Sequence, residues 1–272
     1  MTTLVHLSDL HFGRDVDLEQ IGALESLIPS LKPTAIVISG DLTQRARHGE
    51  FQRALAFVER LRAVGPVHVM PGNHDVAWWE TPFGLLGTGR LTAKYRRYFG
   101  EDLSPTMRLP GVVIASALTS HGVAFGSMTW KFWRDPAVKG HLPVSEVTRI
   151  AGQLKAAPLD LKVIVLHHNV LRGQISRRMG LAHWRWAQDA LVSTGADLVL
   201  CGHDHQEGAA TLGGMAVSTA GTHTGRTRGH RPSAFNLIEA DARSIVIRHQ
   251  SWDRAARTFR SGAPVEFPRR PR

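Results

Sequence analysis

The chain has 272 residues, of which 43% are hydrophobic, and a formal net charge of +10 at pH 7. This apolar fraction suffices for a substantial core, yet the sequence contains no apolar run of about 18 residues that could span a bilayer. The single cysteine, Cys201, excludes an intramolecular disulfide, and the N-terminus lacks the residue order of a signal peptide, so we expect a cytoplasmic protein.

Strands and helices alternate over the first 70 residues. Apolar, β-branched runs predict strands at 4–8, 35–39 and 67–70, whereas 17–31 and 49–63 have the periodicity of amphipathic helices. Strands separated by helices in this way are typical of parallel strands joined by right-handed crossovers.

The pattern becomes less regular from residue 76. We interpret 76–110 as an insertion that lies over the functional site, with a helix at 91–99. The elements expected after it are a hairpin of strands at 112–118 and 123–127, a helix at 144–155, a strand at 162–166, a helix at 183–193, a strand at 197–200, and a meander of short strands to about 250.

These elements predict a single domain over residues 1–262, followed by a basic, flexible tail at 263–272. Its expected fold class is mixed α/β, with two sheets packed together and helices outside.

Five short polar segments follow predicted strands and carry most of the chemical information. They are Asp9-Leu10-His11, Gly40-Asp41, Gly72-Asn73-His74-Asp75, His167-His168 and Gly202-His203-Asp204-His205. Side chains two apart on an extended backbone point the same way, so we expect Asp9 and His11 to grip one ion together. Ligands gather outside the carboxyl ends of strands in α/β sheets, and we therefore expect the five segments to converge.

The ligand types favour two divalent metal ions. Two such ions carry four positive charges, whereas Asp9 and Asp41 are the only anions among the inferred ligands, so the site keeps positive charge for a phosphate oxygen. Mixed Asp, Asn and His ligands without a thiolate suit Mn, Fe, Zn or Co better than calcium.

The five segments resemble the signature of the calcineurin-like metallophosphoesterases, which runs D-x-H, G-D, G-N-H-D/E, H and G-H-x-H. The resemblance covers the chain from Asp9 to about His205, and every part of the signature is present. It implies a double β-sandwich flanked by helices. It also implies two metal sites, one formed by Asp9, His11, Asp41 and His205, the other by Asp41, Asn73, His167 and His203, with Asp41 bridging.

The resemblance further implies that His74 lies beside the metals without binding them. In the family this histidine polarises the phosphate and can protonate the leaving oxygen. Asp75 is expected to orient His74, and His168 to have a supporting role.

Contacts with substrate are expected from the connections between the segments. Trp78 closely follows His74, Arg226 belongs to an arginine cluster after the fifth segment, and His223 follows Gly221-Thr222. The positive charge favours a small anionic phosphoester as the partner. Nucleic acid is a less favoured partner, and the oligomeric state stays open, with a homodimer as one option.

The expected function is hydrolysis of a phosphodiester, nucleotide-like or otherwise small, by attack of a metal-bound hydroxide. The length and Asn73-His74-Asp75 look most like the bacterial cyclic-nucleotide phosphodiesterase (class III) group. A nuclease of the repair-exonuclease type is an alternative because of the charge, but we find no residues for a DNA-contacting domain.

Two further alternatives conflict with particular residues. Lipid-linked nucleotide pyrophosphatases typically place Arg after the Asn, where this chain has His74. An inactive scaffold, as in the retromer subunit with this fold, would have lost metal ligands that this chain keeps.

Overall fold

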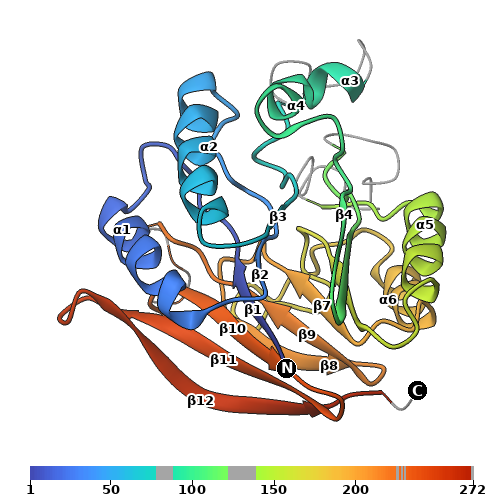
Figure 1. Ribbon diagram of the computed structural model, residues 1–272. Helices are drawn as coiled ribbons and strands as arrows, with labels where there is room; N and C mark the ends of the chain where they lie inside the picture. Colours follow the sequence, from blue (N-terminus) through green and yellow to red (C-terminus); the bar gives the residue numbers. More distant parts are fainter. Residues whose placement is uncertain (78–87, 122–138, 225–226, 228, 230, 271–272) are drawn as a thin grey trace.

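Two six-stranded sheets with helices on their outer faces form the described part of the chain (Figure 1). The structure is a computed structural model that describes residues 1–77, 88–121, 139–224, 227, 229 and 231–270. This mixed α/β architecture confirms the predicted fold class.

The first sheet has the strand order β12-β11-β10-β1-β2-β3. Strands β1, β2 and β3 run parallel, as the alternation of strands and helices predicted, whereas β10, β11 and β12 are antiparallel to their neighbours. The bounds are β1 (Thr2–Leu7), β2 (Ala35–Ile38), β3 (Val67–Val69), β10 (Ala234–Ala240), β11 (Ser244–Asp253) and β12 (Thr258–Pro268).

The second sheet has the order β4-β5-β6-β7-β9-β8. Its four central strands are parallel, and β4 and β8 pair antiparallel at the two edges. The bounds are β4 (Thr106–Leu109), β5 (Val112–Ser116), β6 (Leu161–Val165), β7 (Leu198–Cys201), β8 (Gly208–Leu212) and β9 (Met215–Thr219).

Helices α1 and α2 cover the first sheet, and α5 and α6 cover the second (Figure 1). The Asp17 side chain accepts hydrogen bonds from the backbone of Glu19 and Gln20 and so caps α1. No helix in the described ranges is long and apolar enough to cross a membrane. The bounds are α1 (Leu18–Leu27), a 3₁₀ helix η1 (Ile28–Leu31), α2 (His48–Arg62), α3 (Thr88–Leu91), α4 (Ala93–Phe99), α5 (Val144–Lys155) and α6 (Trp184–Ser193).

Two predicted elements differ in the structure. The helix expected over 17–31 changes to a 3₁₀ helix at Ile28, because Pro29 cannot supply an N–H to continue the α-helical bonds. Strand β5 pairs with β4 and β6, while the strand expected at 123–127 lies outside the described residues.

The predicted boundary of a flexible tail at residue 263 is wrong. Residues 263–268 belong to β12, where Pro264 is opposite Arg248 and Phe267 is opposite Ile245. Composition suggested a frayed end, but the partly buried Val265 and Phe267 alternate with exposed residues, as in a half-buried strand. Of the predicted insertion, residues 78–87 lie outside the description, and β4 belongs to the second sheet.

Alternating side chains divide the apolar residues into three clusters. Leu4, Val37 and Ile114 belong to the cluster between the sheets, whereas Val5 and Ile36 point outward beneath α1 and α2. A third cluster lies between the second sheet and α5 and α6. Where both faces of a strand are covered, its side chains are buried and mostly apolar. A polar residue in such a strand is therefore unusual and needs hydrogen-bond partners.

Two buried histidines, His6 and His68, are polar residues of this kind, and both connect the two sheets. In His6, Nδ1 lies 3.0 Å from Ser218 Oγ on β9, and Nε2 lies 3.0 Å from Ser39 Oγ just after β2. His68 Nε2 on β3 lies 2.5 Å from Ser116 Oγ on β5. Burial lowers the pKa of His6 to about 3 and that of His68 to about 4, so both rings are neutral at pH 7.

We expect acid to destabilise the metal-free protein partly through His68. Its pKa is about 4 in the fold, whereas an unfolded histidine titrates near pH 6.5. Between these values the unfolded state binds more protons, so the free energy of unfolding decreases as pH falls, by up to about 1.4 kcal/mol per pH unit for this group. Urea denaturation between pH 7 and pH 4 measures the slope. A His68→Gln variant should have a shallower slope, and an equal slope would contradict the assignment.

Candidate metal centre

All seven predicted metal ligands gather at one end of the sandwich. They lie in loops that directly follow strands, and both sheets contribute. Asp9 and His11 follow β1, Asp41 follows β2, Asn73 follows β3, His167 follows β6, and His203 and His205 follow β7.

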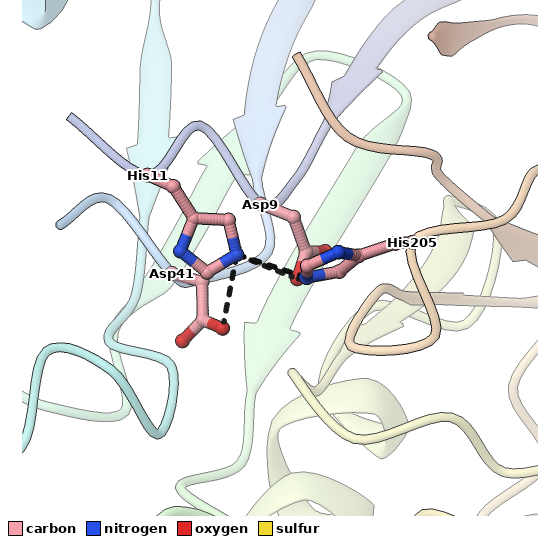
Figure 2. Close-up of side chains that lie close together, drawn as sticks. All are labelled: Asp9, His11, Asp41 and His205. Carbon is pink, nitrogen blue, oxygen red and sulfur yellow. Dashed lines mark hydrogen bonds and ion pairs between the residues drawn. The ribbon is translucent and has the colours of Figure 1, made fainter. Parts of the chain in front are cut away.

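The first group of ligands consists of Asp9, His11, Asp41 and His205, whose ligand atoms all lie within 4.8 Å of one another (Figure 2). His205 Nε2 is 2.9 Å from His11 Nε2 and 3.2 Å from Asp9 Oδ1. His11 Nε2 is also 3.7 Å from Asp41 Oδ2. These atoms surround one point, as the ligands of a single ion must.

The second group is centred on Asn73. Its Oδ1 lies 2.9 Å from His167 Nε2 and 3.0 Å from His203 Nδ1. Asp41 Oδ2, which faces His11 in the first group, is 3.3 Å from His167 Nε2. One carboxylate oxygen therefore borders both groups, which is the position a bridging ligand needs.

The donor atoms fit two divalent ions. Asp9 Oδ1 is buried and, among the described residues, accepts no hydrogen bond of good geometry, although His205 Nε2 lies 3.2 Å away. A buried carboxylate oxygen in this position is costly unless a cation completes its environment. The His11 and His167 Nδ1–H groups donate to the carbonyls of Thr43 and Ser39, at 3.3 and 2.9 Å. In the neutral ring each bond keeps the proton on Nδ1, so that Nε2 can present a lone pair toward the centre.

Both carboxylates are kept ionised by the surrounding imidazoles. Burial by itself would raise the pKa of Asp9, but the nearby imidazoles, chiefly His205, hold the pKa well below its ordinary value. Burial would also raise the pKa of Asp41, but His167 and His74 hold that pKa below its ordinary value. The two carboxylates are thus available as ligands at neutral pH.

Five ligands have left-handed backbone conformations, which corrects the expectation of an extended backbone at Asp9 and His11. Strand β1 ends at Leu7, before both residues. The φ angles are 53° at Asp9, 45° at His11, 53° at Asp41, 70° at His203 and 53° at His205. Such a conformation costs a non-glycine residue about 1–2 kcal/mol. Strain of this kind concentrates at functional sites.

Backbone bonds between neighbouring loops hold these strained residues. Asp9 N–H donates to Gly40 O at 3.1 Å, and His11 N–H donates to Asp41 O at 2.9 Å. Across the sheets, His203 N–H donates to Asp9 Oδ2 at 2.9 Å.

His74 lies beside the ligands, and its neighbours partly differ from those expected. Its ring is 4.8 Å from that of His11, and its backbone N–H donates to Asp41 Oδ1 at 2.8 Å. The Nδ1–H group donates to the Gln44 carbonyl at 2.8 Å, and none of the described residues hydrogen-bonds Nε2.

Asp75, which we expected to orient His74, instead binds backbone. Its carboxylate accepts from the N–H groups of Leu42, Thr43 and Gly72 at 2.8–3.0 Å and so joins the loops after β2 and β3. The Gln44 carbonyl orients the imidazole in its place. A direct catalytic role for Asp75 stays a prediction.

The predicted substrate contacts stay predictions. The His223 side chain is 0% exposed and packs against Phe235 and Phe259, while its backbone N–H donates to the carbonyl of the ligand Asp9 at 3.4 Å. Trp78 and Arg226 lie outside the described residues. His168 is buried, with Nδ1 2.8 Å from Thr119 Oγ1 and its ring 4.5 Å from that of His203.

Several supporting groups were missed by the sequence analysis. The carbonyls of Ser39, Thr43 and Gln44 orient imidazoles, but a backbone acceptor has no signature in the residue type. His6 and His68 did have a signal, since each is a polar residue on the inward face of an otherwise apolar strand.

The glycines next to the ligands let the loops of the two sheets approach. A Cβ on Gly202 would collide with Ser8 Oγ and Asp9 Oδ2, and a Cβ on Gly40 would lie 2.8 Å from His167 Nδ1. Both contacts join a loop of one sheet to a loop of the other. Glycine is therefore required by close packing at these positions.

We expect Gly202→Ala to weaken binding of Mn²⁺ by tenfold or more, because the new methyl group pushes the loop carrying His203 and His205 away from Asp9; displaced supporting groups commonly cost about 10–100-fold in metal affinity. Calorimetric titration of metal-free protein measures this. Gly152→Ala in α5, where the added methyl meets open space, is the control and should bind Mn²⁺ normally. Equal affinities in the two variants would contradict the packing argument.

Solved structures with the same fold include enzymes and a Zn²⁺ complex. A dimetal phosphatase from Danio rerio is 14% identical, with a TM-score of 0.67 and 99% of each chain covered. The purple acid phosphatase PPD1 from yellow lupin is 12% identical, with a TM-score of 0.68 over 98% of this chain and 54% of the other. Vps29 from Entamoeba histolytica, complexed with Zn²⁺, is 11% identical, with a TM-score of 0.51 and 98% and 99% covered.

The similarity to these structures shows the fold alone, because the identities are low. No curated protein sequence matches the chain. The profile of the calcineurin-like phosphoesterases, however, matches residues 2–207, which include all seven ligands and His74. The chain therefore belongs to the calcineurin-like phosphoesterase family.

Proposed function

We propose that this protein is a phosphodiesterase that hydrolyses a nucleotide-like or other small phosphodiester. The observation that carries the proposal is the position of His74 beside a group of seven converging metal ligands, with an Nε2 that no residue in the described part of the chain hydrogen-bonds. Family membership supports the coarser statement that the chain is a metal-dependent phosphoesterase.

Two divalent metals held by the seven ligands supply Lewis-acid chemistry, since they orient a phosphate and neutralise the charge that develops on its oxygens. The ligands bring only the two carboxylates of Asp9 and Asp41 to this centre. An anionic phosphoester is therefore attracted to it.

The chain's own contribution to bond cleavage is assigned to His74. Because Nδ1–H is held by the Gln44 carbonyl, Nε2 is the nitrogen that gains and loses a proton. Once protonated there, the ring can stabilise the phosphate and donate the Nε2 proton to the leaving oxygen. The hydrogen bond from the His74 backbone N–H to Asp41 Oδ1 fixes the position of His74 relative to Asp41, the proposed bridging ligand.

The choice of a diester over a monoester is part of the proposal. A diester carries one negative charge, whereas a monoester carries nearly two at neutral pH. A centre whose ligands include the two carboxylates of Asp9 and Asp41 attracts either anion, so the relative rates on the two substrate classes decide between them.

We expect Mn²⁺-loaded protein to hydrolyse linear or cyclic diesters faster than monoesters. A panel of bis-p-nitrophenyl phosphate, p-nitrophenyl phosphate, cyclic AMP, nucleotide diphosphate conjugates and single-stranded DNA measures this by product release. Turnover of cyclic AMP to AMP would support the cyclic-nucleotide group. Preference for the monoester would contradict the proposal, and degradation of DNA would favour a nuclease.

We expect His74→Ala to lower kcat by about 10²–10⁴-fold on a diester with a poor leaving group, because proton donation is lost. On bis-p-nitrophenyl phosphate the loss should be smaller, since p-nitrophenolate needs little protonation. Metal content should stay that of the wild type, because His74 is not a ligand. His48→Ala is the matched control, a surface histidine bonded to Tyr98. Equal losses on both substrates would exclude the role of proton donor.

A further inference from the structure

Just beneath the metal centre, the space between the sheets changes from apolar to polar. Along β1 the inward side chains are Leu4 and then His6, and along β9 they are Ala216 and then Ser218. Strands β3 and β5 supply a second pair of inward polar residues, His68 and Ser116. Each of these four polar side chains is at most 2% exposed.

Both buried histidines bond across the sandwich. His6 reaches Ser218 on the second sheet with Nδ1 and Ser39 on the first sheet with Nε2, each at 3.0 Å. Asn236 Nδ2 donates to the same Ser218 Oγ at 2.7 Å, and its Oδ1 lies 2.7 Å from His249 Nδ1. His68 and Ser116 form a second, separate bridge of 2.5 Å.

The bridge at His6 is directly joined to the metal ligands. Ser39, which its Nε2 contacts, also accepts a hydrogen bond on its carbonyl from His167 Nδ1 at 2.9 Å. Ser39 precedes the bridging Asp41 by two residues. A change in the position of Ser39 would therefore displace Asp41 in the first sheet and His167 in the second.

The centre needs a fixed distance between the sheets, because each group of ligands contains members from both. Functional sites must be held within about 0.5 Å of their working geometry. Apolar packing is non-directional, whereas hydrogen bonds fix both distance and angle. The apolar cluster between the sheets favours their contact, and hydrogen bonds across the sandwich define the spacing at the ligand end. The bridges at His6 and His68 are two of these, beside the bond from His203 N–H to Asp9 Oδ2.

We propose that His6 and His68 are positioning residues that set the separation of the two sheets beneath the metal centre, and so the distance between ligands of the first and second sheets. The inference rests on the dinuclear centre of the proposed function. It assigns these histidines no contact with metal or substrate.

We expect the fold to tolerate the loss of these bridges. Replacing a buried polar pair on both sides by apolar groups of similar shape is commonly neutral or stabilising, whereas removing one partner leaves the other unsatisfied. The double variant His6→Phe/Ser218→Ala thus removes the bridge while the space between the sheets stays filled. Ser39 Oγ keeps the Leu7 carbonyl as a partner, and Asn236 Nδ2 keeps the Thr219 carbonyl. Loss of a residue that serves only the fold lowers stability and leaves metal affinity unchanged. Loss of a positioning residue lowers metal affinity and leaves stability near that of the wild type.

The test is calorimetric titration of metal-free protein with MnCl₂, together with the EPR spectrum of the loaded protein, which reports magnetic coupling between two Mn²⁺ ions. We expect wild-type protein to bind two ions. In His6→Phe/Ser218→Ala and in His68→Phe/Ser116→Ala, the weaker ion should bind about 10–100-fold less tightly, and the coupling should change. Thermal unfolding of both metal-free variants should stay near that of the wild type.

Leu4→Ala is the matched control, a fully buried inward residue two positions before His6 on β1. It should lower the melting temperature but preserve Mn²⁺ affinity and coupling. Each double variant provides the test by itself should the other fail to fold. Unchanged affinity and coupling in the bridge variants would overturn the inference, as would an equal loss of affinity in Leu4→Ala. Failure of wild-type protein to bind two ions would instead overturn the proposed function.

Discussion

The approach of loops from two different sheets is the constraint on which the metal centre depends. His203 N–H on the second sheet donates to Asp9 Oδ2 on the first at 2.9 Å, and Gly202 has no side chain that would prevent this contact. Around it lie left-handed ligands and buried carboxylates, which are unfavourable in isolation. The three apolar clusters supply the stability against which this local strain is sustained.

Much of the fold was predictable because its strands are covered on both faces. Residues 35–39, 144–155 and 162–166 have clear patterns and form β2, α5 and β6 nearly as expected. The end of the chain was not predictable from composition, since proline and arginine suggested a frayed tail. In β12 the pairing with β11 prevails over these local preferences, which is a tertiary effect that local sequence does not contain.

The site was predictable where side chains perform the chemistry and was missed where the backbone does. The ligand types and their positions after strands indicated all seven ligands, and the structure brings these together. The left-handed conformation of Asp9 was not foreseen, because an extended strand was assumed to continue through it. The partner of His74 is a main-chain carbonyl, and any residue at position 44 could provide it.

The order of the strands also governs when the site can form during synthesis. His11 and its neighbour His205 are separated by 194 residues, and β1 receives its antiparallel partner only from β10, where Thr2 pairs with Ala240. At about 5–20 residues per second, a ribosome needs roughly 10–40 s to pass from the first ligands to the last. A nascent chain therefore carries Asp9 and His11 for that interval without His205, and their group of ligands is complete only late in synthesis.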